Sequence, residues 1–151
     1  FTRDPVPVLF EENYPFDIGR AVVLREGSDV TVAAIRDLVV QALVAAQTLS
    51  GKGIQARVLD CHTLKPLDEE ALLEAAEETG AIVTAENNIR FGGLGSAVAE
   101  LLVTHRPVPM EQVALADAFA ESGPYLDLID KYGLTARHIA AAAEKALKRK
   151  G

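Results

Sequence analysis

Short apolar runs alternate with longer stretches of helical spacing along most of this chain. Residues 30–35 form a nearly uninterrupted run of apolar and β-branched side chains, which is typical of a strand buried on both faces. Residues 81–85 have the same character. Shorter runs predict further strands at residues 21–24, 56–59 and 113–116.

Between these runs, apolar residues recur at intervals of three and four, the spacing of one helix face. Asp37 is placed to cap the first helix, and Gly51 or Gly53 to end it. Strands that alternate with helices give an α/β fold with a mostly parallel sheet and helices on both sides. The predicted helices cover residues 38–49, 68–79, 96–104 and 135–147.

The first 19 residues do not follow this alternation. They contain three prolines among mixed apolar and acidic residues, and proline fixes φ and removes a backbone donor. We therefore expect residues 1–19 to be an arm or linker and residues 20–151 to be one domain. The chain starts at Phe1 without a signal-peptide pattern, so we expect a fragment of a longer polypeptide.

Composition narrows the class of protein. Hydrophobic residues make up 49% of the 151 residues, which is enough for a core, whereas aromatics make up only 5%. The net charge of -7 and the lack of a basic stripe argue against nucleic acid as a partner. No apolar run is long enough to span a membrane. The single cysteine, Cys61, fits a reducing compartment, and we expect a cytoplasmic protein.

A glycine-containing loop is the most conspicuous local motif. Gly92, Gly93, Gly95 and Ser96 follow a predicted strand and open a helix, where backbone N–H groups favour an anion. The loop matches neither the dinucleotide fingerprint nor the phosphate loop. We interpret it as a tight turn with close helix packing, and keep regulatory anion or nucleotide binding as an alternative hypothesis.

Glu86 stands at the end of the strand before this loop, where ligands often bind in open α/β sheets. It is thus a candidate catalytic carboxylate, but no second carboxylate is placed beside it. We favour a structural role in which Glu86 accepts hydrogen bonds from the N–H groups of residues 92–96.

The remaining reactive side chains form no recognisable site. The three histidines are isolated in sequence, so no metal site is predicted. Cys61 and His62 are neighbours, but neighbours on a strand point to opposite faces and make a poor nucleophile–base pair. We therefore predict no catalytic and no cofactor-binding residue in this chain.

An ordered series of motifs closely resembles the C-terminal domain of transketolase. The resemblance is strongest to the split form, in which a second subunit carries the pyrimidine-binding domain and this one. It covers nearly the whole chain from Arg3, and residues 3–7 match the joint that leaves the pyrimidine-binding domain. The matching segments are residues 26–32, 59–68, 79–86, 92–100, 122–123 and 131–135.

The resemblance implies a three-layer α/β/α domain with a mixed five-stranded sheet whose first strand runs antiparallel. In the family, the two preceding domains hold thiamine diphosphate and Mg²⁺, and the enzyme transfers a two-carbon ketol unit between sugar phosphates. The C-terminal domain does not bind the cofactor. It packs against the upstream pyrimidine-binding domain and the diphosphate-binding subunit in a homo- or heterodimer or tetramer.

The same domain type occurs in the β subunit of 2-oxoacid dehydrogenases, where it is also a docking module, and in deoxyxylulose-phosphate synthase. These enzymes are the alternative to a transketolase. Two departures from the family pattern suggest a specialised paralogue. Arg36 replaces a residue able to take a positive φ, so we expect that turn to be built differently, and Asn87 and Asn88 replace an acidic residue and a histidine.

Overall fold

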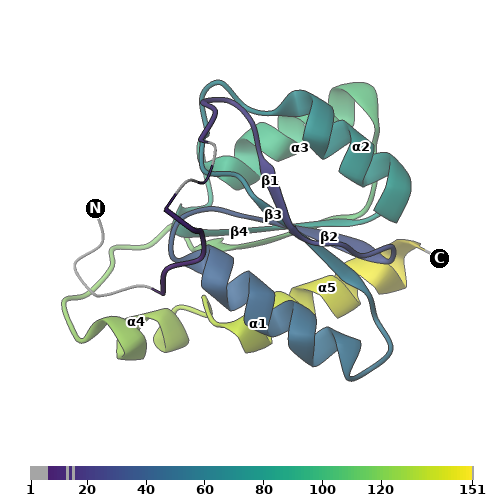
Figure 1. The fold of residues 1–151 in the computed structure, drawn as a ribbon. Coiled ribbons are helices and arrows are strands. Elements are labelled where there is room, and N and C mark those ends of the chain that lie inside the picture. Colours follow the sequence, from purple (N-terminus) through teal and green to yellow (C-terminus); the bar gives the residue numbers. More distant parts are fainter. Residues whose placement is uncertain (1–6, 13, 15, 151) are drawn as a thin grey trace.

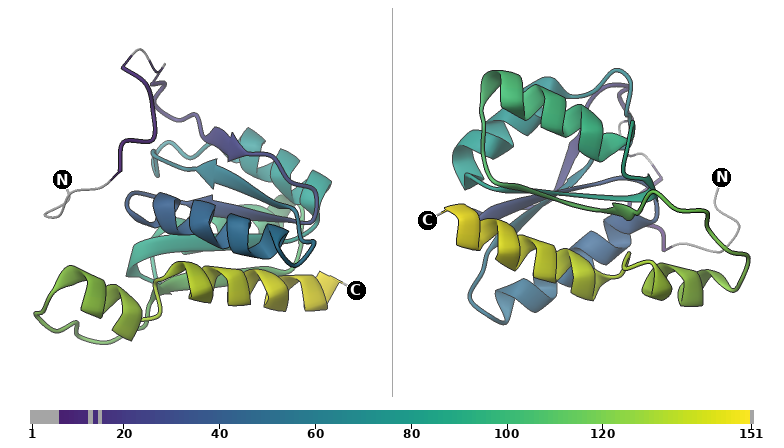
Figure 2. Two further views of the ribbon diagram at one scale, coloured as in Figure 1. Left: turned by 60° about the horizontal axis from the view of Figure 1, so that its bottom comes forward. Right: turned by 180° about the vertical axis from the view of Figure 1, so that it is seen from behind.

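Helices cover both faces of a mixed β-sheet in the computed structural model, which describes residues 7–12, 14 and 16–150 (Figure 1, Figure 2). This arrangement confirms the expected three-layer α/β/α fold. In chain order the elements are β1 (Val22–Arg25), β2 (Val30–Ala34), α1 (Leu38–Ser50), β3 (Ala56–Asp60), α2 (Glu69–Thr79), β4 (Ile82–Ile89), α3 (Leu94–His105), β5 (Met110–Leu115), α4 (Tyr125–Lys131) and α5 (Ala136–Lys150).

The central strand of the sheet is β2. Within the described residues the sheet has five strands in the order β1-β3-β2-β4-β5. Strand β2 pairs in parallel with β3 and β4, and β5 extends the sheet in parallel from β4. Strand β1 pairs antiparallel with the outer side of β3. The first strand therefore runs antiparallel, as the family resemblance implied.

Alternate side chains of each strand enter two separate hydrophobic clusters. Val83 and Ala85 of β4 pack with α1 and α5, whereas Ile82 packs with α2 and α3. The same alternation in β2 sends Val32 to the first cluster and Ala33 to the second. Because both faces are covered, β2 is buried along its whole length, which explains its unbroken apolar run.

Several predicted boundaries were wrong at the β4–α3 region. Strand β4 continues to Ile89, into the segment expected to be loop, because Ile89 pairs with Leu115 of β5. Helix α3 begins at Leu94 and not at Ser96. The sequence analysis missed α4 altogether, and β5 lies at residues 110–115 instead of 113–116.

The start of α1 also differs from the expectation. Asp37 is the N-cap residue, but its side chain makes no capping hydrogen bond. Instead, its Oδ2 accepts a hydrogen bond from the hydroxyl of Tyr125 in α4. Arg36 has φ of 62°, so this residue keeps the left-handed backbone that we expected it to lose. The turn thus has its positive φ on a non-glycine residue.

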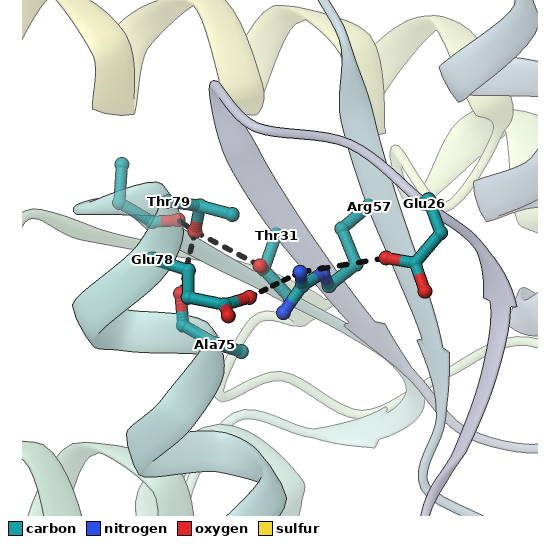
Figure 3. A network of polar contacts seen from close by, with 7 residues as sticks. Glu26, Thr31, Arg57, Ala75, Glu78 and Thr79 are labelled. Atoms are coloured by element: carbon teal, nitrogen blue, oxygen red, sulfur yellow. Dashed lines mark hydrogen bonds and ion pairs between the residues drawn. The ribbon is translucent and has the colours of Figure 1, made fainter.

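A buried threonine pair and an exposed ion pair fasten the amino end of the sheet to α2 (Figure 3). The Thr79 hydroxyl lies 2.9 Å from that of Thr31 and 2.7 Å from the carbonyl oxygen of Ala75. Arg57 of β3 pairs with Glu78 of α2 (Figure 3). These contacts link β2 and β3 to the last turn of α2.

The amino-terminal segment contains no helix or strand in its described residues, 7–12, 14 and 16–21. Within it, the rings of Phe10 and Tyr14 stack at 3.9 Å, and the ring of Phe16 lies 4.4 Å from that of His62. The joint expected at residues 3–7 lies outside the described residues except for Pro7. None of the helices in the described part of the chain is long and apolar enough to cross a membrane.

Candidate functional site

Glu86 and the glycine loop come together at the start of α3. The Glu86 side chain is 3% exposed, and its Oε2 accepts a hydrogen bond from Leu94 N at 3.0 Å. Its Oε1 accepts a second from Gly95 N at 2.8 Å. The expected hydrogen bonds from the loop to Glu86 are therefore present. They satisfy backbone donors that the first turn of a helix leaves free.

An irregularity in β4 aims Glu86 at this helix. Ala85 pairs with Val113 and Ile89 with Leu115, so β4 contains extra residues between the two pairs. Such bulges bend a strand and redirect side chains. The polar residues that interrupt the apolar run of β4 are the same ones that turn its carboxylate toward α3.

Gly93 allows this contact because a side chain there has no space. Gly93 is the N-cap residue of α3, and an added Cβ would overlap the carboxylate of Glu86. Gly95 packs against the side chains of Gln112 and Thr84, where an added Cβ would lie 2.9 Å from the Gln112 Cδ. Both glycines therefore serve close packing, as we interpreted them from the sequence.

Ser96 closes the turn from the other side. Its Oγ accepts a hydrogen bond from Gly92 N at 2.8 Å and lies 3.2 Å from the carbonyl oxygen of Arg90. All five residues predicted for the loop site thus lie together. Their polar groups contact one another, and the N–H groups at the helix start are already used by Glu86.

The start of α3 does not fit the diphosphate of thiamine diphosphate, because its N–H groups already donate to Glu86. A diphosphate at this helix terminus would compete with the buried carboxylate of Glu86 for the same donors. No group of three or more His, Cys, Asp or Glu side chains in the described part of the chain could hold a metal ion. We derive no chemical step through the cofactor from this chain.

Cys61 is unsuited to nucleophilic chemistry. It lies in the core cluster next to α2 and α3, and burial, assisted by the charges of Asp60 and Asp68, raises its pKa to about 12. His62 instead has its Nδ1 2.9 Å from the Thr63 hydroxyl. The two neighbours therefore have different surroundings, in agreement with the sequence interpretation.

Some buried polar atoms without partners lie at the carboxyl edge of the sheet, where β2, β3 and β4 end, namely Tyr14 Oη, Asp37 Oδ1, His62 Nε2 and Asn87 Oδ1. Two others, Arg25 Nε and Arg57 Nε, lie away from this edge. Burial raises the pKa of Tyr14 and of Asp60 at the same edge. Unpaired buried polar atoms are rare in folded proteins, so each one needs an explanation. The sequence analysis missed this feature, although Asn87 was noted as a departure from the family.

A shallow groove of about 650 Å³ lies beside the loop. It runs between residues 64–69 and α3, and its lining includes Lys65, Glu100 and His105. Its lining also includes the apolar residues Leu64, Pro66 and Leu101.

Comparison with protein-family models assigns the chain to a family. The family described as "Transketolase, C-terminal domain" matches residues 19–139. The chain belongs to this family.

Individual relatives of this C-terminal domain agree. Over 98% of its length the chain is 49% identical to the 6-deoxy-6-sulfo-D-fructose transketolase subunit SqwH of Clostridium sp. (strain MSTE9), covering 46% of that protein. It is 44% identical to 1-deoxy-D-xylulose-5-phosphate synthase 1 of Geobacter sulfurreducens (strain ATCC 51573 / DSM 12127 / PCA) over 95% of its length, covering 23% of that protein. The transketolase subunit is the more similar of the two.

A solved structure shows the same fold. It is described as a split gene transketolase, inactive beta4 tetramer, and it matches with a TM-score of 0.95 and 49% identity. The match covers 99% of this chain and 49% of that chain. The transketolase C-terminal domain described here thus spans about half the length of the split transketolase proteins that it matches.

Proposed function

We propose that residues 20–151 are the non-catalytic structural and dimerisation domain of a transketolase subunit, with residues 1–19 as the linker from a pyrimidine-binding domain. The observation that carries this proposal is the internal use of the loop donors by Glu86. The loop of residues 92–96, which was the best candidate for ligand binding in the sequence, instead serves packing. Its role is to hold the start of α3 against β4.

The whole enzyme transfers a two-carbon ketol unit between sugar phosphates with thiamine diphosphate and Mg²⁺, which other domains and a diphosphate-binding subunit hold. The similarity in length and sequence to split transketolase subunits supports this proposal. The similar sulfofructose enzyme and the family departures at Arg36, Asn87 and Asn88 support an unusual sugar as substrate. The single cysteine, Cys61, fits a reducing compartment and supports a cytoplasmic enzyme, and the similarity to transketolase subunits supports a role in carbohydrate metabolism.

The domain acts by fixing the geometry of its neighbours. The amino-terminal segment contacts the carboxyl edge of the sheet, where the ring of Phe16 lies 4.4 Å from that of His62, and this supports our assignment of that edge to the upstream domain. Accurate placement matters because an error of about 1 Å in a catalytic group can cost about a hundredfold in rate.

Calorimetry tests the non-catalytic role. Titration of the 151-residue chain with thiamine diphosphate and Mg²⁺ should give no binding heat, and the chain should show no ketol transfer. Micromolar cofactor binding would contradict the proposal.

The positive role is tested on the full-length gene product with and without residues 20–151. Removal of the domain should abolish assembly and ketol transfer together. Unchanged assembly after the deletion would refute a dimerisation role. An assay of deoxyxylulose-phosphate synthesis on the same protein tests the alternative, which the 44% identical synthase favours.

A further inference from the structure

A turn at residues 17–20 leads the amino-terminal segment into β1. Arg20 N donates a hydrogen bond to Asp17 O at 3.1 Å, which closes the turn, and Gly19 has a φ of 85°. Residues with a side chain rarely adopt this backbone. The turn lies close against the loop before α2, where a Cβ added to Gly19 would be 2.9 Å from the Cγ of Pro66. The glycine therefore allows the turn to pack against that loop.

Asp68 fastens the chain directly after this turn. Its Oδ2 accepts a hydrogen bond from Ala21 N at 2.7 Å, across 47 positions of sequence. Its Oδ1 accepts a second from Ala71 N at 3.2 Å and so caps α2, whose N-cap residue is Asp68. Asp68 is only 7% exposed. One buried carboxylate thus joins the entry to β1 with the start of α2.

The helix cap alone does not require a carboxylate at this position. Serine and asparagine cap helices about as well as aspartate, and one side-chain oxygen is enough for the cap. The second oxygen of Asp68 is the one that holds Ala21, and a backbone N–H donates a stronger hydrogen bond to a carboxylate than to a neutral oxygen. The neighbouring ion pair of Arg20 with Glu70 is exposed on both sides and contributes little. The attachment therefore depends on Asp68.

A second contact holds the segment on the other side of the turn. The ring of Phe16 lies 4.4 Å from that of His62, two residues beyond the end of β3. Phe16 and Ala21 thus lie on either side of the turn, and each is attached to a different segment of the domain. With both ends attached, residues 16–21 are held to one path over the domain.

We propose that Asp68 is a positioning residue, which fixes the direction in which the upstream part of the protein joins this domain. The inference rests on the proposed function, in which residues 1–19 are the linker from a pyrimidine-binding domain. Residues 16–19 are the last part of that linker, so a rotation there turns everything upstream of it relative to the sheet. Asp68 acts through Ala21 and takes no part in the chemistry.

Hydrogen exchange in the 151-residue chain tests the attachment. Asp68→Ser keeps one oxygen to cap α2, but its side chain is too short to hold Ala21 as well. The amide of Ala21 should then exchange roughly tenfold faster or more, whereas the amide of Ala71 should keep its protection. Glu69→Ser, at the next and exposed position, is the matched control for the lost charge and should leave both amides unchanged. Unchanged exchange at Ala21 in Asp68→Ser would overturn the proposal.

Gly19→Ala disturbs the same joint from the side of the linker and leaves the cap of α2 intact. Its methyl group would meet Pro66, and its backbone would be strained at a φ of 85°. It should therefore also speed exchange at Ala21 and leave Ala71 protected. This variant keeps the test decisive if Asp68→Ser fails to fold. Exchange at Ala21 that stays at the wild-type rate in Gly19→Ala would also count against the joint.

The full-length gene product tests the positioning role. Asp68→Ser and Gly19→Ala should each lower kcat for ketol transfer by roughly tenfold or more and raise the KM for thiamine diphosphate, while Glu69→Ser should behave as wild type. Loss of folded protein alone would lower kcat and leave that KM unchanged, because the remaining enzyme would be normal.

The outcomes separate this inference from the proposed function. Wild-type kinetics in both joint variants, or a lower kcat at an unchanged KM for thiamine diphosphate, would overturn the positioning role and leave the proposed function standing. A wild-type full-length protein that transfers no ketol unit would instead contradict the proposed function, and the positioning role with it. The attachment of Ala21 by Asp68 would then still be decided by the exchange experiment alone.

Discussion

Glu86 replaces a local helix cap, because Gly93 at the N-cap position of α3 has no side-chain oxygen that could accept a hydrogen bond. Its carboxylate arrives from β4 and accepts hydrogen bonds from two buried N–H groups. A cap of this kind fixes the helix to the sheet as well as closing its first turn. Loss of this cap should therefore destabilise both α3 and its packing against β4.

Replacement of Glu86 tests this role. Glu86→Ala leaves the N–H groups of Leu94 and Gly95 buried without partners, and we expect the free energy of unfolding to fall by about 2–4 kcal/mol. Urea unfolding followed by circular dichroism measures it. Glu86→Gln keeps an acceptor and should cost less than the alanine variant. Equal losses for both variants would show that the hydrogen bonds are not the cause.

The Cys61 thiol gives a prediction about pH. Its pKa is about 12 in the folded chain against an ordinary 9.0, so the unfolded state loses this proton first as the pH rises. The thiol therefore contributes a stability loss of up to about 1.4 kcal/mol per pH unit between pH 9.0 and about 12, the window between its two pKa values. Comparison of the wild-type chain with Cys61→Ala in unfolding experiments at alkaline pH isolates this contribution. A disulfide reagent at neutral pH should label Cys61 only after unfolding.

At the scale of elements, the sequence pattern predicted the buried strands correctly but did not predict the exposed ends of elements. Strand β2 was predicted within one residue because burial on both faces leaves an unbroken apolar run. The end of β4 was missed because Asn87 and Asn88 interrupt that run, and only the pairing with β5 shows that the strand continues. Helix α4 was missed because it has seven residues, with Leu126 exposed and only Ile129 buried.

In the candidate site, too, some contacts could be predicted from the sequence and others could not. The contact between Glu86 and the loop lies within one strand–turn–helix unit, so sequence spacing was enough to predict it. The Tyr125–Asp37 hydrogen bond joins residues 88 positions apart, which local patterns do not report. The left-handed backbone of Arg36 was wrongly excluded because residue type alone disfavours it, whereas in the structure Arg36 has a φ of 62° in the connection between β2 and α1.

Two glycines give a matched test of the strand connections. An added Cβ at Gly27 would overlap the backbone of Ala56 and Arg57, so Gly27→Ala should separate the β1–β2 turn from β3. We expect it to destabilise the chain by more than 3 kcal/mol, the scale of a severe core substitution. At Gly53 nothing lies within 4 Å, and Gly53→Ala meets only the cost of φ at +79°, about 1–2 kcal/mol. Thermal unfolding of both variants makes the comparison, and similar losses would contradict the packing argument.

At the scale of the whole molecule, the two cores share one sheet. Leu72 belongs to the cluster beside α2 and α3, and Ile139 to the cluster beside α1 and α5. Every buried strand contributes to both clusters, so neither face can lose its helices without exposing the other side of the same strands. The domain should therefore unfold as one cooperative unit.

Leu72→Ala and Ile139→Ala test this coupling. Each should cost about 2–5 kcal/mol, since both side chains are completely buried. In each variant the unfolding midpoint should fall, and it should be the same whether unfolding is followed by helix content or by the reactivity of Cys61. Separate transitions for the two probes would show that the faces unfold independently.

The strand order has a consequence for folding of the domain during its synthesis on the ribosome. Strand β2 is synthesised before both of its neighbours, β3 and β4, and the last helix over one of its faces is α5 at residues 136–150. That face is therefore fully covered only after residues 136–150 have been synthesised. Until then the nascent chain carries an open apolar sheet, and its safe emergence depends on chaperones or on fast final closure by α5.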